Sequence, residues 1–504
     1  MRPEIVLICL AGSVFAQSVD AGPVFDEIPM AEHRYTGGWE HFVGGGLAVF
    51  DCNGDDLPEL FAAGGDSPAT LFVNVTGASG RLEFDPVTPE NLSLTGLTGA
   101  YPLDIDSDGT LDLALLSTGA NRVMRGLGGC AFEPFDLGLP ETEQWTTAFT
   151  TTWEAGQVLP TLVFGNYVDR MNPEGPFGTC DTHVLLRPDG GHYADPIVLE
   201  PGFCALSMLF SDWSRSQQPD LRVSNDRHYF VRGGAEQMWR ISPDISLYTE
   251  ENGWQNHALW GMGIASRDVT GDGLPDVYLS SMGDQRLQIR QGDGARWVDV
   301  PYAWGTAAQR PHTGDDGRPS TGWHTAFGDV QNDGLDDIFV AKGNVDQMPD
   351  MAMDDPNSLL IATGRRRWAE GAADAGVASM ARGRGAALVD LNGDGLLDLA
   401  VVNRRAAMQV WQNVTEDAGH WLSIALRQPT PNVFAVGAWI EVETDGMVQA
   451  REITIGGGHA GGSFVPEHFG LGQARGVRAR VIWPDGDTGE WSVLEPDRAH
   501  ILAR

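Results

Sequence analysis

The chain has 504 residues, enough for two or more domains, and 42% of them are apolar, as in ordinary globular proteins. Its 64 glycines follow no collagen-like period, and such a surplus is typical of an all-β chain with many turns. The net charge of −36 argues against nucleic acid or an anionic membrane as a partner, because both would be repelled.

Residues 1–16 have the pattern of a secretory signal peptide. A basic start precedes a short apolar stretch over residues 5–14, and small residues precede a cleavage point after Ala16. The apolar stretch is too short to span a bilayer. Cys9 suggests a lipoprotein, but Ile8 stands where a lipoprotein signal needs a small residue. We therefore expect export to the medium, the periplasm or the cell surface, without membrane insertion of the mature chain.

Five nine-residue segments share one pattern, and they begin at Asp51, Asp104, Asp268, Asp329 and Asp390. Each has oxygen-bearing side chains at positions 1, 3, 5 and 9, and four of the five have glycine at position 6. Apolar runs typical of strands precede and follow each segment. The pattern therefore predicts a loop between two neighbouring strands.

This spacing suits calcium, which takes six to eight oxygen ligands from side chains and backbone carbonyls. An EF-hand begins in the same way, but its last carboxylate is at position 12 and helices flank it. A single Asp-Gly loop could equally be an ordinary hairpin turn. Five copies at one spacing favour calcium sites.

The predicted ligands are the residues at positions 1, 3, 5, 7 and 9, the seventh through its backbone carbonyl. They are Asp51, Asn53, Asp55, Leu57, Glu59, Asp104, Asp106, Asp108, Thr110, Asp112, Asp268, Thr270, Asp272, Leu274, Asp276, Asp329, Gln331, Asp333, Leu335, Asp337, Asp390, Asn392, Asp394, Leu396 and Asp398. We expect about five bound Ca²⁺, most tightly held at the all-carboxylate loop 104–112.

Two further segments look like degenerate copies of the loop. Residues 212–220 keep the first and last carboxylates and could bind a cation weakly, whereas residues 153–161 keep only the flanking apolar runs. The seven units begin 49–61 residues apart, enough for four strands each. They predict a seven-bladed β-propeller over residues 22–413. The last unit lacks a fourth strand, so we expect residues 23–29 to supply it and close the ring.

The repeat units resemble FG-GAP/VCBS repeats, the calcium-bearing blades of integrin-α-like propellers. The resemblance rests on phrases such as Gly322-Trp323 and Phe327-Gly328-Asp329. Residues 414–504 are similar to the ASPIC/UnbV domain, through Gly419-His420-Trp421-Leu422, Gly456-Gly457-Gly458, His468-Phe469-Gly470-Leu471-Gly472 and Trp483-Pro484-Asp485-Gly486. This combination resembles the cartilage acidic protein family and its bacterial relatives, which implies a propeller, calcium sites and export. The strand-like alternation of this tail predicts a small β domain.

Four cysteines remain after the signal peptide, and an even number in an exported protein favours disulfides. Three pairings are possible. We expect Cys180 to pair with Cys204, which would tie a long loop of the third unit to the start of the fourth. Cys52 would then pair with Cys130 across the first two units.

The sequence contains no motif for a catalytic nucleophile, a zinc protease or a phosphate loop, and we assign no catalytic residue. We expect His459 and His468 to be structural rather than metal-binding. Candidate ligand-binding residues lie on the rim opposite the calcium loops, where aromatic rings and arginines suit sugars or protein anchors. They are Trp39, Trp260, Trp323, His324, Lys342, Arg382 and Arg384. The alternative for each tryptophan is a wedge between blades.

Two functions are compatible with these features. The first is an extracellular binding or scaffold protein that recognises a glycan or a protein through this rim. The second is a secreted glycan lyase or hydrolase with its active site in the central funnel.

Overall fold

The computed structural model describes residues 22–172, 178–193, 195–226, 231 and 233–504, so the predicted signal peptide lies outside the described residues. The protein is all-β, as predicted, and the one α-helix of the described part is the short α1 (Ala372–Ala375). No helix in these ranges is long and apolar enough to cross a membrane.

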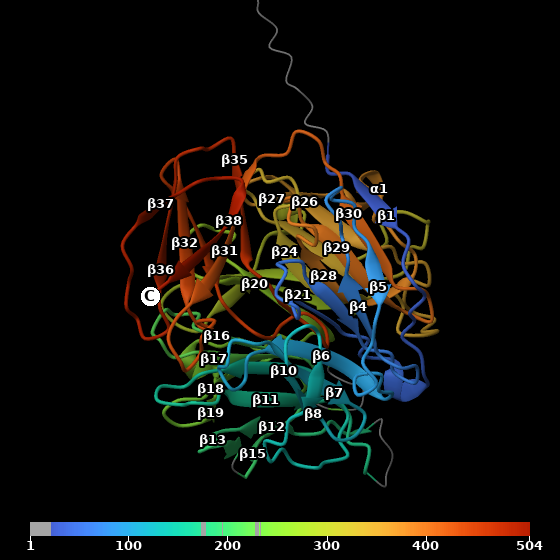
Figure 1. Ribbon diagram of the computed structural model, residues 1–504. Coiled ribbons are helices and arrows are strands. Elements are labelled where there is room, and N and C mark those ends of the chain that lie inside the picture. Colours follow the sequence, from blue (N-terminus) through green and yellow to red (C-terminus); the bar gives the residue numbers. More distant parts are fainter. Residues whose placement is uncertain (1–21, 173–177, 194, 227–230, 232) are drawn as a thin grey trace, which may run out of the picture.

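Most strands belong to seven sheets (Figure 1), each built on four antiparallel strands of the repeat region, and the first sheet has β34 (Ser463–Phe464) of the C-terminal region as a fifth strand. The first three sheets contain β2 (Leu47–Phe50), β3 (Glu59–Ala62), β4 (Thr70–Asn74) and β5 (Phe84–Pro86); β6 (Leu97–Leu103), β7 (Asp112–Ser117), β8 (Arg122–Gly126) and β9 (Phe132–Pro134); and β10 (Thr146–Thr152), β11 (Thr161–Asn166), β12 (His183–Leu186) and β15 (Ile197–Leu199). The next three contain β16 (Ala205–Ser211), β17 (Asp220–Asn225), β18 (Gln237–Arg240) and β19 (Ser246–Leu247); β20 (Gly261–Arg267), β21 (Asp276–Ser281), β22 (Arg286–Arg290) and β23 (Trp297–Asp299); and β24 (Gly322–Gly328), β25 (Asp337–Lys342), β26 (Ser358–Gly364) and β27 (Arg367–Glu370). A hairpin of β13 (Pro188–Asp189) and β14 (His192–Tyr193) extends the third unit.

The seventh sheet joins both ends of the repeat region. It contains β28 (Arg382–Val389), β29 (Asp398–Arg404), β30 (Gln409–Asn413) and, from the N-terminus, β1 (Phe25–Ile28). β1 runs antiparallel to β30, with Phe25 opposite Asn413 and Ile28 opposite Val410. The predicted fourth strand at residues 23–29 is therefore confirmed.

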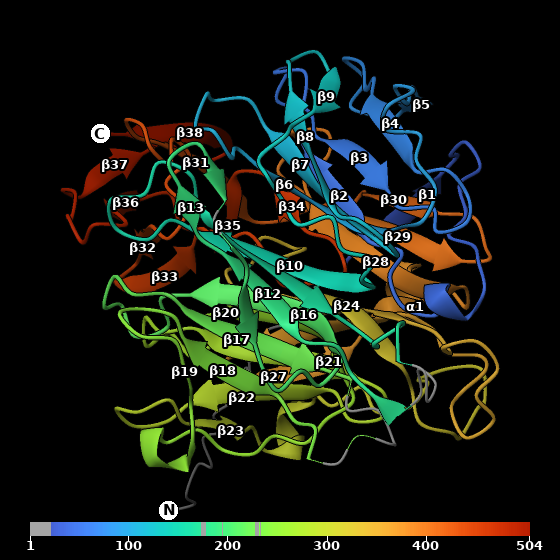
Figure 2. The same cartoon turned by 90° about the horizontal axis from the view of Figure 1, so that it is seen from below.

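The first strands of the seven sheets pack against one another in sequence order. β2 contacts β6, and the series continues through β10, β16, β20 and β24 to β28, which in turn contacts β2. Figure 2 shows these strands toward the middle of the molecule, and outer strands such as β5 and β23 near its periphery. The apolar core is divided among the interfaces between sheets; one cluster, for example, joins Phe50 and Phe61 to Leu113 and Phe132.

The C-terminal region, residues 414–504, forms two more sheets. β35 (Glu467–Gly472), β31 (His420–Arg427) and β38 (Arg498–Ala503) form one, and β33 (Met447–Glu452), β32 (Trp439–Thr444), β36 (Val477–Ile482) and β37 (Ser492–Leu494) form the other. β34 (Ser463–Phe464) leaves the region and pairs in parallel with β2. The core of the region includes Ile440 and Phe469, and it is continuous with Tyr101 and Phe149 of the second and third sheets.

Both expected disulfides are present. Cys52 is bonded to Cys130 and Cys180 to Cys204, with Cα–Cα distances of 4.8 and 4.9 Å. The first bond joins the first two sheets, and the second joins the long loop after β11 to the start of β16. Two disulfides fit an extracellular protein.

Candidate metal centres

Each of the five acidic loops joins the first strand of a sheet to the second, as the sequence predicts. Loop 1 (51–59) follows β2, loop 2 (104–112) β6, loop 5 (268–276) β20, loop 6 (329–337) β24 and loop 7 (390–398) β28. The residue at position 9 is in every case the first residue of the second strand. The strand pairing therefore holds the last carboxylate beside the first.

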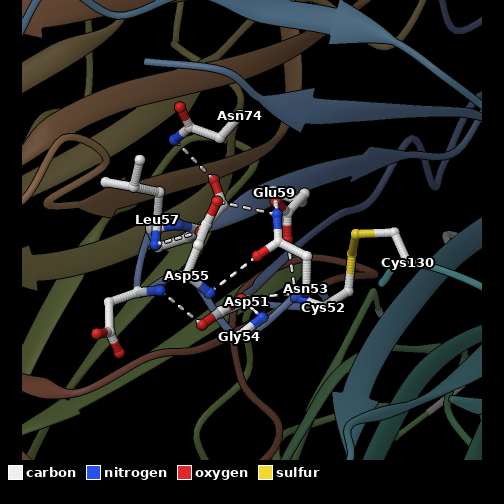
Figure 3. The surroundings of a disulfide bond; sticks show 11 residues. Asp51, Cys52, Asn53, Gly54, Asp55, Leu57, Glu59, Asn74 and Cys130 are labelled. Atoms are coloured by element: carbon white, nitrogen blue, oxygen red, sulfur yellow. Dashed lines mark hydrogen bonds between the residues drawn. A yellow bond between two sulfur atoms is a disulfide. The ribbon is translucent and has the colours of Figure 1, made fainter. Parts of the chain in front are cut away.

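All five loops share one set of hydrogen bonds. The backbone N–H of position 6 donates to the carboxylate of position 1, as Gly273 does to Asp268 at 2.7 Å. The N–H of position 7 donates to the carboxylate of position 5. The N–H of position 2 donates to the carboxylate of position 9, as Cys52 does to Glu59 at 2.7 Å. Figure 3 shows the result in loop 1, where Asp51, Asn53, Asp55 and Glu59 are gathered together.

The backbone of the loops turns at two positions, not one. In loop 1, Gly54 at position 4 has φ of 80° and Asp56 at position 6 has φ of 67°. The sequence analysis noted only the glycine at position 6, although glycine, asparagine or serine occupies position 4 in every copy. Glycine and asparagine, in four of the five copies, tolerate the left-handed conformation well, so position 4 carries a signal that the sequence interpretation did not use.

The surroundings of the loop carboxylates disfavour their ionised forms. Burial, reinforced by the neighbouring carboxylates, raises the pKa of Asp104 to about 7 and that of Asp112 to about 8. The same causes raise the pKa of Asp276 to about 7 and that of Asp329 to about 8. A divalent cation would offset both the burial of these charges and the repulsion between them, because it supplies opposite charge to all the carboxylates of a loop.

Loop 2 shows most clearly that the donor set fits a hard cation. Carboxylate oxygens of Asp104, Asp106 and Asp108 lie within 4.8 Å of one another. Oδ1 of Asp106 is buried and accepts no hydrogen bond from the described residues. Arg125 pairs with Asp106 at 2.6 Å, but through the other oxygen. Uncharged and carboxylate oxygens, with no sulfur or imidazole among them, are the ligands that calcium prefers.

The two degenerate loops are braced by side chains instead. In loop 3 (153–161), the guanidinium of Arg187 bonds both oxygens of Glu154, at 2.7 and 2.9 Å. In loop 4 (212–220), Oδ2 of Asp220 accepts the indole N–H of Trp213 at 2.7 Å and the hydroxyl of Tyr248 at 2.6 Å. Arg187 and Tyr248 are distant in sequence from the loops that they brace, so no linear pattern pointed to them.

One family model matches the end of the chain. Residues 428–504 match the family described as ASPIC and UnbV. The C-terminal region contains an ASPIC/UnbV domain. Cartilage acidic protein 1 of Xenopus tropicalis is 31% identical over 125 residues, and that of Mus musculus is 30% identical over the same length. Each match covers 24% of this chain and spans only 19% of the relative.

Solved structures are similar only at a low level. BBS1N, from its complex with ARL6DN, matches 79% of this chain and 98% of its own at 11% identity, with a TM-score of 0.44. A lectin of Agrocybe aegerita that recognises non-reducing terminal N-acetylglucosamine matches 65% of this chain and 79% of its own at 13% identity, with a TM-score of 0.39.

A glycine-rich segment of the ASPIC/UnbV region, residues 455–464, lies among the first strands of the sheets. Its backbone bonds to β10 at Thr151, to β16 at Met208, to β20 at Ile264, to β6 at Ala100 and to β2 at Val49. We call this segment the central plug. Five of the seven first strands are thus tied to one short stretch of backbone.

His459 lies in the central plug and is structural, as expected. Its Nε2 accepts the backbone N–H of Gly44 at 3.1 Å, and its Nδ1 donates to the carbonyl of Met262 at 3.0 Å. Burial lowers its pKa to about 3, so the ring is neutral. His468 is also engaged, with Nε2 3.1 Å from the carbonyl oxygen of Gly395 in loop 7.

Most of the predicted ligand-binding residues are inside the protein. Trp323 is fully buried, its indole N–H donates to Gly343, and the Arg384 guanidinium lies 3.8 Å above its ring. Lys342 is fully buried 4.0 Å from Asp355. His324 is buried and accepts the backbone N–H of His459.

Three of the predicted residues, Trp39, Trp260 and Arg382, remain half-exposed. Trp39 packs edge-to-face on Trp145 at 4.9 Å, and Arg382 pairs with Asp346 at 3.3 Å. These residues lie near the ends of the strands that face away from the acidic loops.

Proposed function

We propose that residues 22–413 form a seven-bladed propeller of the FG-GAP/VCBS type, braced by about five Ca²⁺ and exported from the cell. The observation that carries the proposal is the repetition of one hydrogen-bonded acidic loop at the same place in five sheets. Seven sheets, each with four antiparallel strands from residues 22–413, support the propeller, because their first strands contact one another in a closed series.

The residues that would hold each ion are those at positions 1, 3, 5 and 9, together with the carbonyl of position 7. A bound Ca²⁺ would neutralise carboxylates that otherwise repel one another. In loops 1 and 7 the amide of Asn53 or Asn392 now donates to the carboxylate at position 5. Each of these side-chain amides would have to turn over when the ion binds, so that its oxygen and not its nitrogen faces the site.

We propose further that the protein binds a glycan or a protein through the face opposite the acidic loops. The ASPIC/UnbV region contacts loops 4, 6 and 7 on the acidic-loop face, and the central plug bonds to five of the first strands. The opposite face therefore carries the surface available to a ligand, with Trp39, Trp260 and Arg382 as the half-exposed candidates. The filled centre argues against the alternative of a lyase or hydrolase active site in the funnel.

Calcium binding should be measurable directly. Calorimetric titration of the metal-free protein is expected to find about five ions, with affinities in the range of roughly 10⁻⁴–10⁻³ M that is typical of extracellular modules. EDTA should lower the melting temperature, because an ion that binds only the folded state stabilises it. Asp108→Asn should remove one ion, whereas Asp293→Asn, in an exposed turn, should remove none. Fewer than three ions, or no effect of EDTA, would refute the calcium proposal.

Ligand binding is best tested with glycan and extracellular-protein arrays, probed with the calcium-loaded chain. Any ligand found should bind at least tenfold more weakly to the Trp39→Ala/Trp260→Ala double variant, because aromatic anchors dominate such contacts. Trp491→Ala in the C-terminal region is the matched control. A ligand whose affinity falls with Trp491→Ala and not with the double variant would place the site elsewhere.

A further inference from the structure

The ASPIC/UnbV region rests directly on loops 6 and 7. Gly419 and Gly472 donate their backbone N–H groups to the carbonyls of Gln331 and Asn332 in loop 6, at 2.9 and 2.7 Å. Arg451 is fully enclosed and bonds Asp336 at position 8 of loop 6, at 3.1 Å. Hydrogen bonds therefore join the region to the backbone that shapes a predicted calcium site.

The ASPIC/UnbV region packs against loops 6 and 7 without room for an added methyl group at two glycines. A Cβ atom on Gly470 would lie 1.9 Å from Oδ2 of Asp329, the carboxylate at position 1 of loop 6. A Cβ on Gly395 at position 6 of loop 7 would lie 2.0 Å from the ring of Trp421. Loops 6 and 7 cannot change shape at these places without moving the region, because Gly470 touches a loop carboxylate and Gly395 touches an aromatic ring.

Loop 4, which lacks a complete ligand set, is a second attachment point. Arg215 pairs with Glu441 on β32 at 2.5 Å and lies 4.3 Å above the Trp439 ring. Glu452 accepts the backbone N–H of Asp212 at 2.6 Å. This attachment is held by side chains, so it can be weakened without altering a predicted calcium ligand.

We infer that cation binding at loops 6 and 7 and docking of the ASPIC/UnbV region are thermodynamically coupled, an inference that rests on the calcium proposal. A cation fixes the loop conformation that presents the carbonyls of Gln331, Asn332 and Gly395 to the region. The docked region stabilises the same loop conformation through its hydrogen bonds to these carbonyls. Each event therefore favours the other by the same factor, about 5- to 150-fold for ordinary coupling.

The first test measures amide hydrogen exchange of residues 467–474 in the full-length chain with and without Ca²⁺. Calcium should slow exchange of these amides about fivefold or more. Asp333→Asn keeps the hydrogen-bond acceptor for Leu335 but removes a charge from loop 6, and it should reduce the slowing, with loop 7 left to supply the rest. Asp55→Asn is the matched change in loop 1, where the carboxylate bonds within its own loop, and it should leave the slowing intact.

Calorimetry on the same variants separates the two proposals. If the wild-type chain binds no calcium, the calcium proposal fails. If Asp333→Asn loses one ion while exchange of residues 467–474 stays unchanged, the calcium proposal stands and the coupling is wrong.

The second test runs in the opposite direction. Glu441→Ala removes the partner of Arg215 in loop 4, together with a pair to Arg480 inside the region, and should weaken calcium binding at two sites by about fivefold. Glu443→Ala, two residues along β32, breaks a pair with Arg478 inside the region and should not. Equal calcium affinities in the two variants, with faster exchange in Glu441→Ala alone, would overturn the coupling.

Discussion

Replacing both Phe25 and Ile28 by alanine is expected to destabilise the fold by about 5 kcal/mol or more. Both side chains are buried, and they reach different interfaces. Phe25 packs with Phe339 and Trp411, whereas Ile28 packs with Leu47 and Val410. β1 therefore contributes to the apolar contacts on both sides of the seventh sheet, as well as to its edge.

Asp26→Ala/Glu27→Ala is the matched control, because these two residues lie between the buried pair on the same strand and are exposed. Its unfolding free energy should stay within about 0.5 kcal/mol of the wild-type value. Deleting residues 22–30 should go further and leave β30 as an open edge, so that aggregated protein replaces monomer. Size-exclusion chromatography and chemical denaturation would measure both effects. A deletion variant that stays monomeric and melts normally would show that the seventh sheet does not need β1.

Gly99→Ala is expected to displace the central plug and to lower the free energy of unfolding by about 3 kcal/mol. A Cβ on Gly99 would lie 1.7 Å from the carbonyl oxygen of Ala460, and one on Gly46 would lie 1.8 Å from the same atom. That oxygen also accepts the N–H of Ala100, so the clash and the lost hydrogen bond act together.

Gly77→Ala controls for the loss of a glycine, since a Cβ there meets nothing within 4 Å. Chemical denaturation of the two variants should differ by about 3 kcal/mol. Proteolysis between residues 455 and 464 should become faster in Gly99→Ala while the protein is still folded. Equal stability of Gly99→Ala and Gly77→Ala would mean that the plug moves without cost and does not hold the strands together.

Local patterns were enough to predict the sheets, the acidic loops and the closing strand. A loop between adjacent strands is built from consecutive residues, so its oxygens, its glycines and its flanking apolar runs appear together in the sequence. The same reasoning placed Cys52–Cys130 and Cys180–Cys204, because each pair lies near a boundary between predicted units. The turn at position 4 of the loops could have been predicted from the same local pattern, but it was not.

Contacts between distant segments were decided by the tertiary structure alone. Arg187 and Tyr248 brace loops whose ligand sets are incomplete, and the central plug reaches five sheets from a region near the C-terminus. Trp323 and Lys342 were assigned to a ligand surface because they fall on the predicted rim opposite the calcium loops, but both are fully buried. Whether such a side chain faces solvent depends on which backbone packs over it. That backbone belongs to distant parts of the chain, so its effect on exposure is absent from any local pattern.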